Sequence, residues 1–243
     1  MSDQDQAWYD RFFRHEYLVF DHHTETELEV DFIQKTLALS SETRVLDLCC
    51  GYGRHSNLLS QHCSIFGLDR SDVMLSRASA NVSSKALFTR GDMRALPFPF
   101  ETFDAVVSLF SSFGYFDDES ENYRVLRGIS ETLAPGGRIL IETVNREFVV
   151  RHSAPQQVYR PENITLIEER SFDPVSSRTR VDVTLFKEGR ETHLYHSIRI
   201  YAFTELEMLL QSVGLKTINV WGNYKGSDFT VGSKHMIVLA ERT

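Results

Sequence analysis

Short apolar runs alternate with longer segments of helical periodicity over residues 44–142. The apolar runs predict five strands, at residues 44–48, 64–68, 86–89, 103–110 and 138–143. Apolar residues three or four positions apart predict helices between them, at residues 54–62, 71–80 and 119–133. Strands that alternate with helices form a parallel sheet covered on both sides, so the pattern predicts an α/β fold.

The periodicity changes in the following part of the chain. Hydrophobic and polar residues alternate at period two over residues 166–172, 179–186 and 191–201. Breaks at Asp173-Pro174 and Glu188-Gly189 separate these segments, as turns between strands do. The pattern predicts a three-strand antiparallel meander.

The α/β pattern resumes after the meander. Residues 204–214 predict a helix, and residues 213–221 and 235–240 predict two strands that complete the sheet as an antiparallel pair. The expected organisation is one α/β domain with an inserted β-sheet. The domain comprises residues 1–150 and 203–243, and the insertion comprises residues 151–202.

The N-terminal part is rich in aromatic residues. Six aromatic side chains lie within residues 7–20, which predict a helix. Either this helix packs an apolar face on the core, or it forms a lid over a ligand. Residues 26–39 predict a second helix, with Leu28, Phe32 and Ile33 at helical spacing.

Composition restricts the class of protein. A chain of 243 residues with 42% hydrophobic residues fits one large globular domain, or one domain with an insertion. The net charge of −8 argues against a nucleic-acid or anionic-membrane partner, which requires a basic face. No nucleic-acid or membrane partner is expected. We expect a small-molecule substrate and a monomer or homodimer.

The distribution of cysteine and of apolar residues indicates the compartment. Cys49, Cys50 and Cys63 form neither a disulfide framework nor a metal-ligand spacing, so no metal is expected. No apolar run approaches the roughly 20 residues of a membrane span. The first six residues are too polar to open a signal peptide. A reduced, cytoplasmic setting is expected.

Three strand ends carry residues suited to binding a nucleotide. The first strand, which holds Asp47, runs into a turn containing Gly51 and Gly53 and then into a helix. Such a turn lets backbone amides approach a ligand closely. Asp69 follows the second strand, about 20 residues beyond Asp47, the offset at which an acidic side chain reaches ribose hydroxyls. Asp92 ends the third strand, so three strand ends converge on one ligand.

The order and spacing of these motifs resemble the class I S-adenosylmethionine-dependent methyltransferases, whose sheet is Rossmann-like. The resemblance is carried by residues 45–53, 67–71 with 74–75, 91–98, 103–107 and 133–137. That family usually has glycine where Cys49 stands. Because this position must accept a side chain, an unusual backbone angle is not expected there.

The resemblance implies a cofactor and a set of residues that hold it. Asp69 would bind the ribose hydroxyls of S-adenosyl-L-methionine and Asp92 its adenine amino group, with Met74 and Met93 beside the adenine ring. The complete expected cofactor site is Tyr9, Tyr17, Asp47, Cys49, Gly51, Gly53, Asp69, Arg70, Met74, Asp92, Met93 and Leu109.

A narrower resemblance concerns the acceptor. Tyr9 and Tyr17, residues 110–115 and the inserted β-sheet are similar to small-molecule N-methyltransferases, especially amino-sugar N,N-dimethyltransferases and, more distantly, glycine N-methyltransferase. The likeness implies that Tyr9 and Tyr17 close over the sulfonium and the methionine carboxylate. It also implies that the inserted sheet roofs the acceptor pocket.

Three residues are candidates for catalysis on the acceptor side, because ligands in such folds bind at the carboxyl ends of the strands. Tyr115 follows the fourth strand and either orients the acceptor or packs in the core. His152 follows the fifth strand and is either a base or an exposed loop residue. In the meander, Arg199 shares a polar face with His193, and this face is either solvated or the pocket ceiling.

Methyl transfer to a small molecule, preferentially at nitrogen, is the function that this sequence favours. The reaction chiefly requires alignment of the acceptor and exclusion of water, so a chain without a catalytic triad is compatible with it. Two alternatives stay open. The chain could methylate a protein, or it could bind S-adenosylmethionine without catalysing a reaction.

Overall fold

The computed structural model describes residues 7–21, 23–80, 86–160 and 163–243. Its larger sheet has the strand order β10-β11-β5-β4-β1-β2-β3. The strands of this sheet are β1 (Arg44–Leu48), β2 (Ser64–Asp69), β3 (Ala86–Arg90), β4 (Phe103–Ser108), β5 (Leu133–Val144), β10 (Leu215–Trp221) and β11 (His235–Arg242). The first five run parallel, whereas β11 is antiparallel to both of its neighbours. The predicted α/β sheet and its final antiparallel pair are confirmed.

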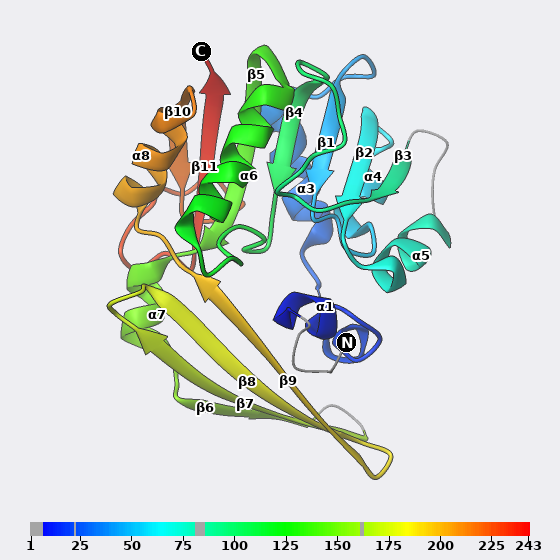
Figure 1. Ribbon diagram of the computed structural model, residues 1–243, viewed down its shortest axis with the longest axis vertical. Coiled ribbons are helices and arrows are strands. Elements are labelled where there is room, and N and C mark those ends of the chain that lie inside the picture. Colours follow the sequence, from blue (N-terminus) through cyan, green and yellow to red (C-terminus); the bar gives the residue numbers. More distant parts are fainter. Residues whose placement is uncertain (1–6, 22, 81–85, 161–162) are drawn as a thin grey trace.

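Helices cover both faces of this sheet (Figure 1). They are α3 (Thr26–Leu37), α4 (Arg54–Leu59), α5 (Asp72–Ala80), α6 (Glu119–Thr132) and α8 (Phe203–Ser212), whereas the short helix α7 (Arg146–His152) lies where the chain passes to the second sheet. Alternate residues of one strand serve different faces: Val106 packs in one apolar cluster with α6 and α8, and Val107 packs in another with α3 and α4. Burial on both faces explains the continuously apolar strand of the sequence. Within the described ranges, no helix is long and apolar enough to cross a bilayer.

A second, antiparallel sheet lies beyond the carboxyl ends of β1, β2 and β4 (Figure 1). Its strands are β6 (Gln156–Tyr159), β7 (Ile164–Asp173), β8 (Arg178–Lys187) and β9 (Arg190–Arg199), paired in chain order. The prediction of three strands was wrong by one. The strand β6 was missed because it is four residues long and begins with Gln156 and Gln157, so it shows little alternation of apolar and polar residues.

The N-terminal segment lies between the two sheets (Figure 1). It forms two short helices, α1 (Trp8–Phe12) and α2 (Tyr17–Phe20), where one helix was expected. Trp8 and Phe12 are buried in the same apolar cluster as the helices α6 and α8 and residues of the second sheet. The aromatic residues therefore join the two sheets, and we refer to residues 8–20, which include α1 and α2, as the lid.

Candidate active site

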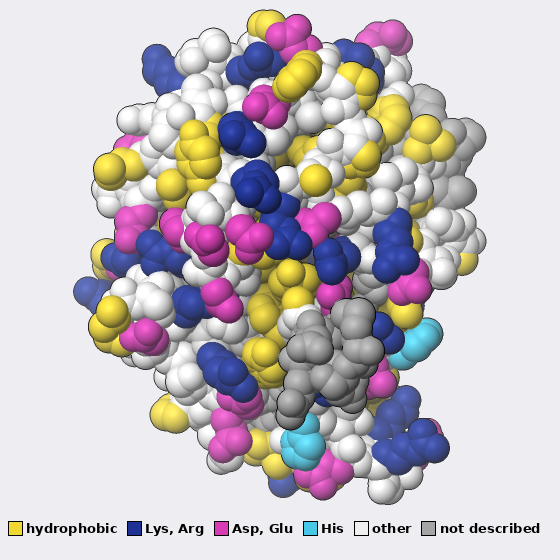
Figure 2. Space-filling model, viewed as in Figure 1, with side chains coloured by type: hydrophobic (Ala, Val, Ile, Leu, Met, Phe, Trp, Pro, Cys, Tyr) yellow, Lys and Arg dark blue, Asp and Glu magenta, His cyan; other side chains and the backbone are white. Residues whose placement is uncertain are grey.

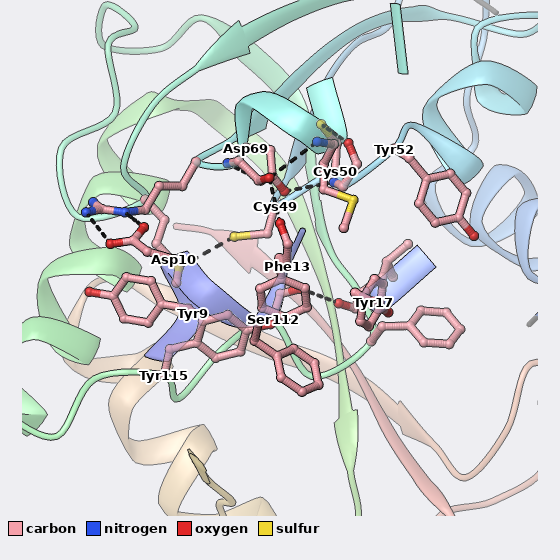
Figure 3. A pocket seen from close by; sticks show the side chains of 18 of the residues that line it. Tyr9, Asp10, Phe13, Tyr17, Cys49, Cys50, Tyr52, Asp69, Ser112 and Tyr115 are labelled. Atoms are coloured by element: carbon pink, nitrogen blue, oxygen red, sulfur yellow. Dashed lines mark hydrogen bonds and ion pairs between the residues drawn. The ribbon is translucent and has the colours of Figure 1, made fainter. Parts of the chain in front are cut away.

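A cavity of about 450 Å³ opens at the carboxyl ends of β1, β2 and β4, between the larger sheet and the lid (Figure 3). Parallel sheets bind their ligands at this edge, and the volume is typical of small-molecule sites. Every residue of the expected cofactor site except Gly53 lines it. The side chains come from segments far apart in sequence, as the motif spacing predicted.

The turn after β1 shapes one wall of the cavity. A Cβ atom on Gly51 would meet nothing within 4 Å, so a ligand can approach the backbone there. A Cβ atom on Gly53 would instead meet Ala78 and Phe88 at 3.0 Å, so Gly53 serves helix packing. Cys49 has a φ of +60°, contrary to the expectation of an ordinary backbone angle. The cysteine therefore occupies the left-handed conformation for which glycine is better suited.

Asp69 fixes this turn through its carboxylate. Its Oδ2 accepts a hydrogen bond from the Gly51 amide at 2.8 Å, and its Oδ1 accepts one from the Ser71 amide at 2.8 Å. Burial raises the pKa of Asp69, although the backbone hydrogen bonds oppose this. Each carboxylate oxygen has a further lone pair, which can accept a hydrogen bond from a hydroxyl group of a ligand.

Asp47 lies deeper in the same wall. Its carboxylate is buried and accepts a hydrogen bond from Ser56 Oγ at 2.5 Å, which ties β1 to α4. Burial raises the pKa of Asp47. Asp47 therefore supports the turn on which Gly51 lies, in addition to lining the cavity.

Asp92 lies at the centre of an ion-pair network that reaches the lid. Its Oδ2 is 2.6 Å from Arg70 Nη1 and 2.7 Å from Arg94 Nη2. Arg70 also pairs with Asp10 of α1, with 2.5 Å between Nε and Oδ1 (Figure 3). Burial alone would raise the pKa of Asp92, but the hydrogen bonds and charge of Arg94, with the charge of Arg70, lower it. The network joins the lid to the ends of β2 and β3.

An apolar slot lies beside these carboxylates. Met74, Met93 and Leu109 are buried and line the cavity. Methionine side chains are polarizable and adapt to flat rings. The slot and the carboxylates together offer apolar contacts for a flat ring and hydrogen-bond acceptors for its polar edge.

Aromatic rings form the opposite side of the cavity (Figure 3). The Tyr115 ring stacks with Tyr9, at 6.3 Å between centroids, and with Phe13, at 5.9 Å. Ser71 Oγ donates a hydrogen bond to the Phe13 carbonyl at 2.7 Å and so holds the lid to the loop after β2. Burial raises the pKa of Tyr115 and of Tyr17, so both hydroxyls stay protonated at neutral pH.

The second sheet contributes a further wall. Glu168 of β7 and His196 and Ile198 of β9 line the cavity. The His196 ring contacts Phe12 and Trp8 of the lid, at 5.0 and 6.4 Å between centroids. The face of β9 that points to the cavity is therefore the one with Ile198, opposite to the polar face that we considered from the sequence.

Comparison with known proteins agrees with this geometry. Residues 45–137 match a family described as "Methyltransferase domain". The chain is 26% identical over 215 residues to "Putative methyltransferase YqeM" of Bacillus subtilis (strain 168), covering 85% of this chain and 87% of the relative. It is also 26% identical over 195 residues to a dTDP-3-amino-3,4,6-trideoxy-alpha-D-glucopyranose N,N-dimethyltransferase of Streptomyces venezuelae. This match covers 77% of this chain and 81% of the relative. The chain carries a methyltransferase domain with the class I fold.

A solved structure shares the complete architecture of this methyltransferase. The CcbJ methyltransferase from Streptomyces caelestis superposes with a TM-score of 0.86 and 17% sequence identity, covering 98% of this chain and 99% of that chain. At this identity the likeness establishes the fold alone. It shows that the lid, the larger sheet and the second sheet recur together in one fold.

Arg199 does not reach the cavity of the methyltransferase. Its guanidinium pairs with Glu119 of α6 at 3.1 Å and with Glu205 of α8 at 3.4 Å, and it donates to the Ser176 carbonyl at 2.8 Å. On the face of the molecule drawn in Figure 2, acidic and basic side chains lie side by side in a band across the middle. Arg199 thus fastens the second sheet to the helices, because it lies on the outward face of β9.

His152 is also remote from the cavity, whereas Tyr115 lines it. The His152 ring stacks on Phe148 at 4.5 Å within α7, and its Nδ1 is 3.1 Å from the Phe148 carbonyl oxygen. His152 is exposed at the end of the helix α7, which the sequence pattern did not predict. Of the three acceptor-side candidates, the structure brings only Tyr115 to the cavity.

Arg54 lines the cavity and was missed from the sequence. Its Nη1 pairs with Glu29 at 2.6 Å and donates to Thr26 Oγ1 at 2.7 Å, and its guanidinium lies 4.2 Å from the Phe110 ring centroid. A basic residue in the first turn of a helix is unfavourable for the helix dipole, and this signal could have marked it as functional.

Proposed function

We propose that this methyltransferase transfers the methyl group of S-adenosylmethionine to the nitrogen of a small-molecule amine. The observation that carries the proposal is the division of one cavity into two unlike sides. The side formed by the strand ends offers carboxylates and an apolar slot, and the other side offers aromatic rings and a histidine. The first side suits an adenosyl group and the second an uncharged or cationic acceptor.

The residues present fit S-adenosylmethionine. Asp69 would accept hydrogen bonds from the ribose hydroxyls, and Met74, Met93 and Leu109 would contact the adenine ring. Open space above Gly51 leaves room for the methionine part. When bound, the cofactor supplies a methyl carbon activated by a positively charged sulfur. The faces of the Tyr9 and Tyr115 rings suit such a cation, because aromatic faces attract positive charge.

Little acid–base chemistry is required of the protein. The nitrogen lone pair forms the new C–N bond as the C–S bond breaks, and the resulting ammonium then releases one proton. The lid residues exclude water, and the Tyr115 hydroxyl, which stays protonated, orients the acceptor by donating a hydrogen bond. A cavity of this size and depth favours a small molecule over the side chain of a folded protein. The amino-sugar relative supports nitrogen as the atom methylated.

Calorimetry and a transfer assay test the proposal in two steps. The protein is titrated with S-adenosylmethionine, S-adenosylhomocysteine and NAD, and micromolar binding of the first two without binding of NAD is expected. Release of S-adenosylhomocysteine is then measured with matched amines, alcohols and a peptide amine. Turnover of the small amines alone supports the proposal, whereas turnover of the peptide alone or of the alcohols alone refutes it.

A further inference from the structure

The loop between β4 and α6 carries Tyr115 and is held by different parts of the molecule at different points. Near β4, the Ser111 amide donates a hydrogen bond to the Glu142 carbonyl at 3.1 Å, which ties the loop to β5. Further along, the Arg199 amide donates a hydrogen bond to the Gly114 carbonyl at 2.8 Å. Between these two points the loop passes from the larger sheet to the second sheet.

The contact between this loop and the second sheet is made backbone to backbone. Gly114 has a φ of +99°, and a Cβ atom there would clash with the Arg199 carbonyl oxygen. Only glycine lets the two backbones approach so closely. Tyr115 directly follows this contact, so the second sheet, rather than β4, determines where its backbone lies.

Arg178, the first residue of β8, extends the contact to the next two carbonyls of the loop. Its Nη2 donates a hydrogen bond to the Tyr115 carbonyl at 3.0 Å, and its Nη1 donates one to the Phe116 carbonyl at 2.8 Å. It also donates to the Ser197 carbonyl and to Ser197 Oγ of β9, at 2.8 and 3.1 Å. The Asp117 carboxylate, 3.3 Å away, is 91% exposed and contributes little. The carbonyl groups therefore determine where the guanidinium lies.

The Tyr115 carbonyl depends on Arg178 more than the Phe116 carbonyl does. The Phe116 carbonyl also accepts a hydrogen bond from Asn122 Nδ2 at 3.1 Å. No other described residue donates a hydrogen bond to the Tyr115 carbonyl. A buried carbonyl that loses its donor is costly, so the loop would move at Tyr115 if Arg178 were absent.

We propose that Arg178 is a positioning residue for methyl transfer, which places the Tyr115 hydroxyl in the cavity by holding the Tyr115 carbonyl. The inference rests on the proposed function, in which this hydroxyl orients the acceptor. A displacement of about 1 Å in such a group can lower a rate about hundredfold. Arg178 is not among the residues that line the cavity, so its loss should slow transfer without weakening the binding of the cofactor.

Fluorine NMR tests the positioning without turnover. The protein is labelled with 3-fluorotyrosine, and spectra are recorded with and without S-adenosylhomocysteine. The Tyr115 and Tyr224 signals are assigned by their absence in the respective phenylalanine variants. The Tyr115 signal should shift or broaden in Arg178→Ala and in Arg178→Lys, which keeps the charge but not the planar fork.

Two outcomes of this measurement overturn the inference. One is a Tyr115 signal that is unchanged in both Arg178 variants. The other is loss of the native fold in both variants, which would make the role of the arginine structural. Tyr224 reports the fold, because it packs in the apolar cluster on the other face of the larger sheet.

Arg180→Ala is the matched control for the loss of an arginine. Arg180 lies two positions beyond Arg178 on β8 and therefore on the same face of the second sheet. Its Nη2 pairs with Asp182 of the same strand at 2.7 Å, so its contacts stay within the second sheet. The Tyr115 signal should be the same in Arg180→Ala as in the native protein.

Kinetics separate a positioning role from a structural one. The amine of the transfer assay with the highest kcat/KM is the probe, at saturating S-adenosylmethionine. Arg178→Ala should lower kcat at least about tenfold and leave the Kd of S-adenosylhomocysteine within about twofold. In the Tyr115→Phe background the same substitution should lower kcat less than about twofold, because the hydroxyl group that it positions is already absent. An equal loss of kcat in both backgrounds overturns the inference.

The two proposals fail separately. If the native protein methylates no amine, the proposed function fails, and the fluorine signal alone decides whether Arg178 positions Tyr115. If the native protein methylates amines but Arg178→Ala changes neither the Tyr115 signal nor kcat, the inference fails and the proposed function stands.

Discussion

The two walls of the cavity are built in different ways. The wall at the strand ends consists of turns whose backbone amides are fixed by buried carboxylates, as with Asp69 and the Gly51 amide. The facing wall consists of side chains carried by two short helices and by one face of an antiparallel sheet. In the first wall the backbone determines the site, and in the second wall side chains do.

Because of this difference, the two walls suit different kinds of ligand. Backbone geometry at strand ends changes little when surface side chains change, so it suits a ligand that all members of a fold share. Side chains at alternating strand positions can change without disturbing the pairing of strands, so they suit a ligand that varies between enzymes. In the function that we propose, the first wall would therefore hold the methyl donor and the second wall the acceptor.

The largest expected effect is a loss of ligand affinity at the first wall. Asp69→Ala removes the acceptor for two backbone amides and for the proposed ribose hydroxyls. We expect calorimetry to show binding of S-adenosylhomocysteine weakened by about 1–3 kcal/mol, which is about five- to 150-fold. Asp31→Ala, at an exposed position on α3, should leave the affinity unchanged. Unaltered affinity in Asp69→Ala would remove the distinction between the walls.

The second prediction concerns the second wall and pH. Burial and the charge of Arg170 lower the pKa of His196 to about 4, and Asp182 opposes this. Between pH 6.5 and 4 the unfolded chain binds a proton at this histidine and the folded chain does not. Stability is therefore lost as the pH falls through this window. Relative to His196→Phe, the native protein should lose about 1–2 kcal/mol of unfolding free energy between pH 7 and pH 5.

Chemical denaturation at each pH measures this difference directly. Glu168 pairs with Arg170, whose charge contributes to the lowered pKa, so Glu168→Gln is measured in parallel. The His193→Phe variant replaces an exposed ring on the opposite face of β9 and is measured as the control for the substitution itself. A profile of His196→Phe that coincides with the native one would show that folding does not lower the pKa of His196.

The smallest effect concerns the link between the walls. The pair of Asp10 and Arg70 is partly exposed, so a double-mutant cycle with Asp10→Asn and Arg70→Gln should give a coupling of about 0.5–1 kcal/mol. Each variant should increase hydrogen exchange in residues 8–13. The pair of Arg44 and Asp104, which lies at the amino end of β1 and has a more exposed carboxylate, is the control. Its removal should not change exchange in the lid.

The first wall could be predicted from the sequence because local sequence determines it. The strand at 44–48 was predicted with the bounds of β1, and Asp69 and Asp92 lie at the ends of β2 and beyond β3 as expected. Neighbouring parallel strands end at the same edge of a sheet, so a parallel sheet alone brings the residues at these strand ends together. The φ of Cys49 was not predicted, because the neighbouring packing imposes it against the preference of the residue.

The second wall could not be predicted in the same way. Period two in β9 shows that Arg199 and His196 lie on opposite faces, but it does not show which face meets the cavity. That choice depends on how the sheet docks on the lid, through Trp8 and Phe12. The polar face was considered for the pocket, whereas tertiary packing turned the apolar face with His196 inward.

The two cysteines of the first turn lie where the methyl donor could alkylate them. A sulfonium methyl donor is an alkylating agent, and Cys49 and Cys50 both line the cavity in which we place it. Burial, with the neighbouring carboxylates of Asp69 and Asp47, raises the pKa of both thiols well above its usual range. Only a thiolate attacks such a carbon efficiently. The enzyme can therefore hold a reactive electrophile against two cysteines without methylating itself.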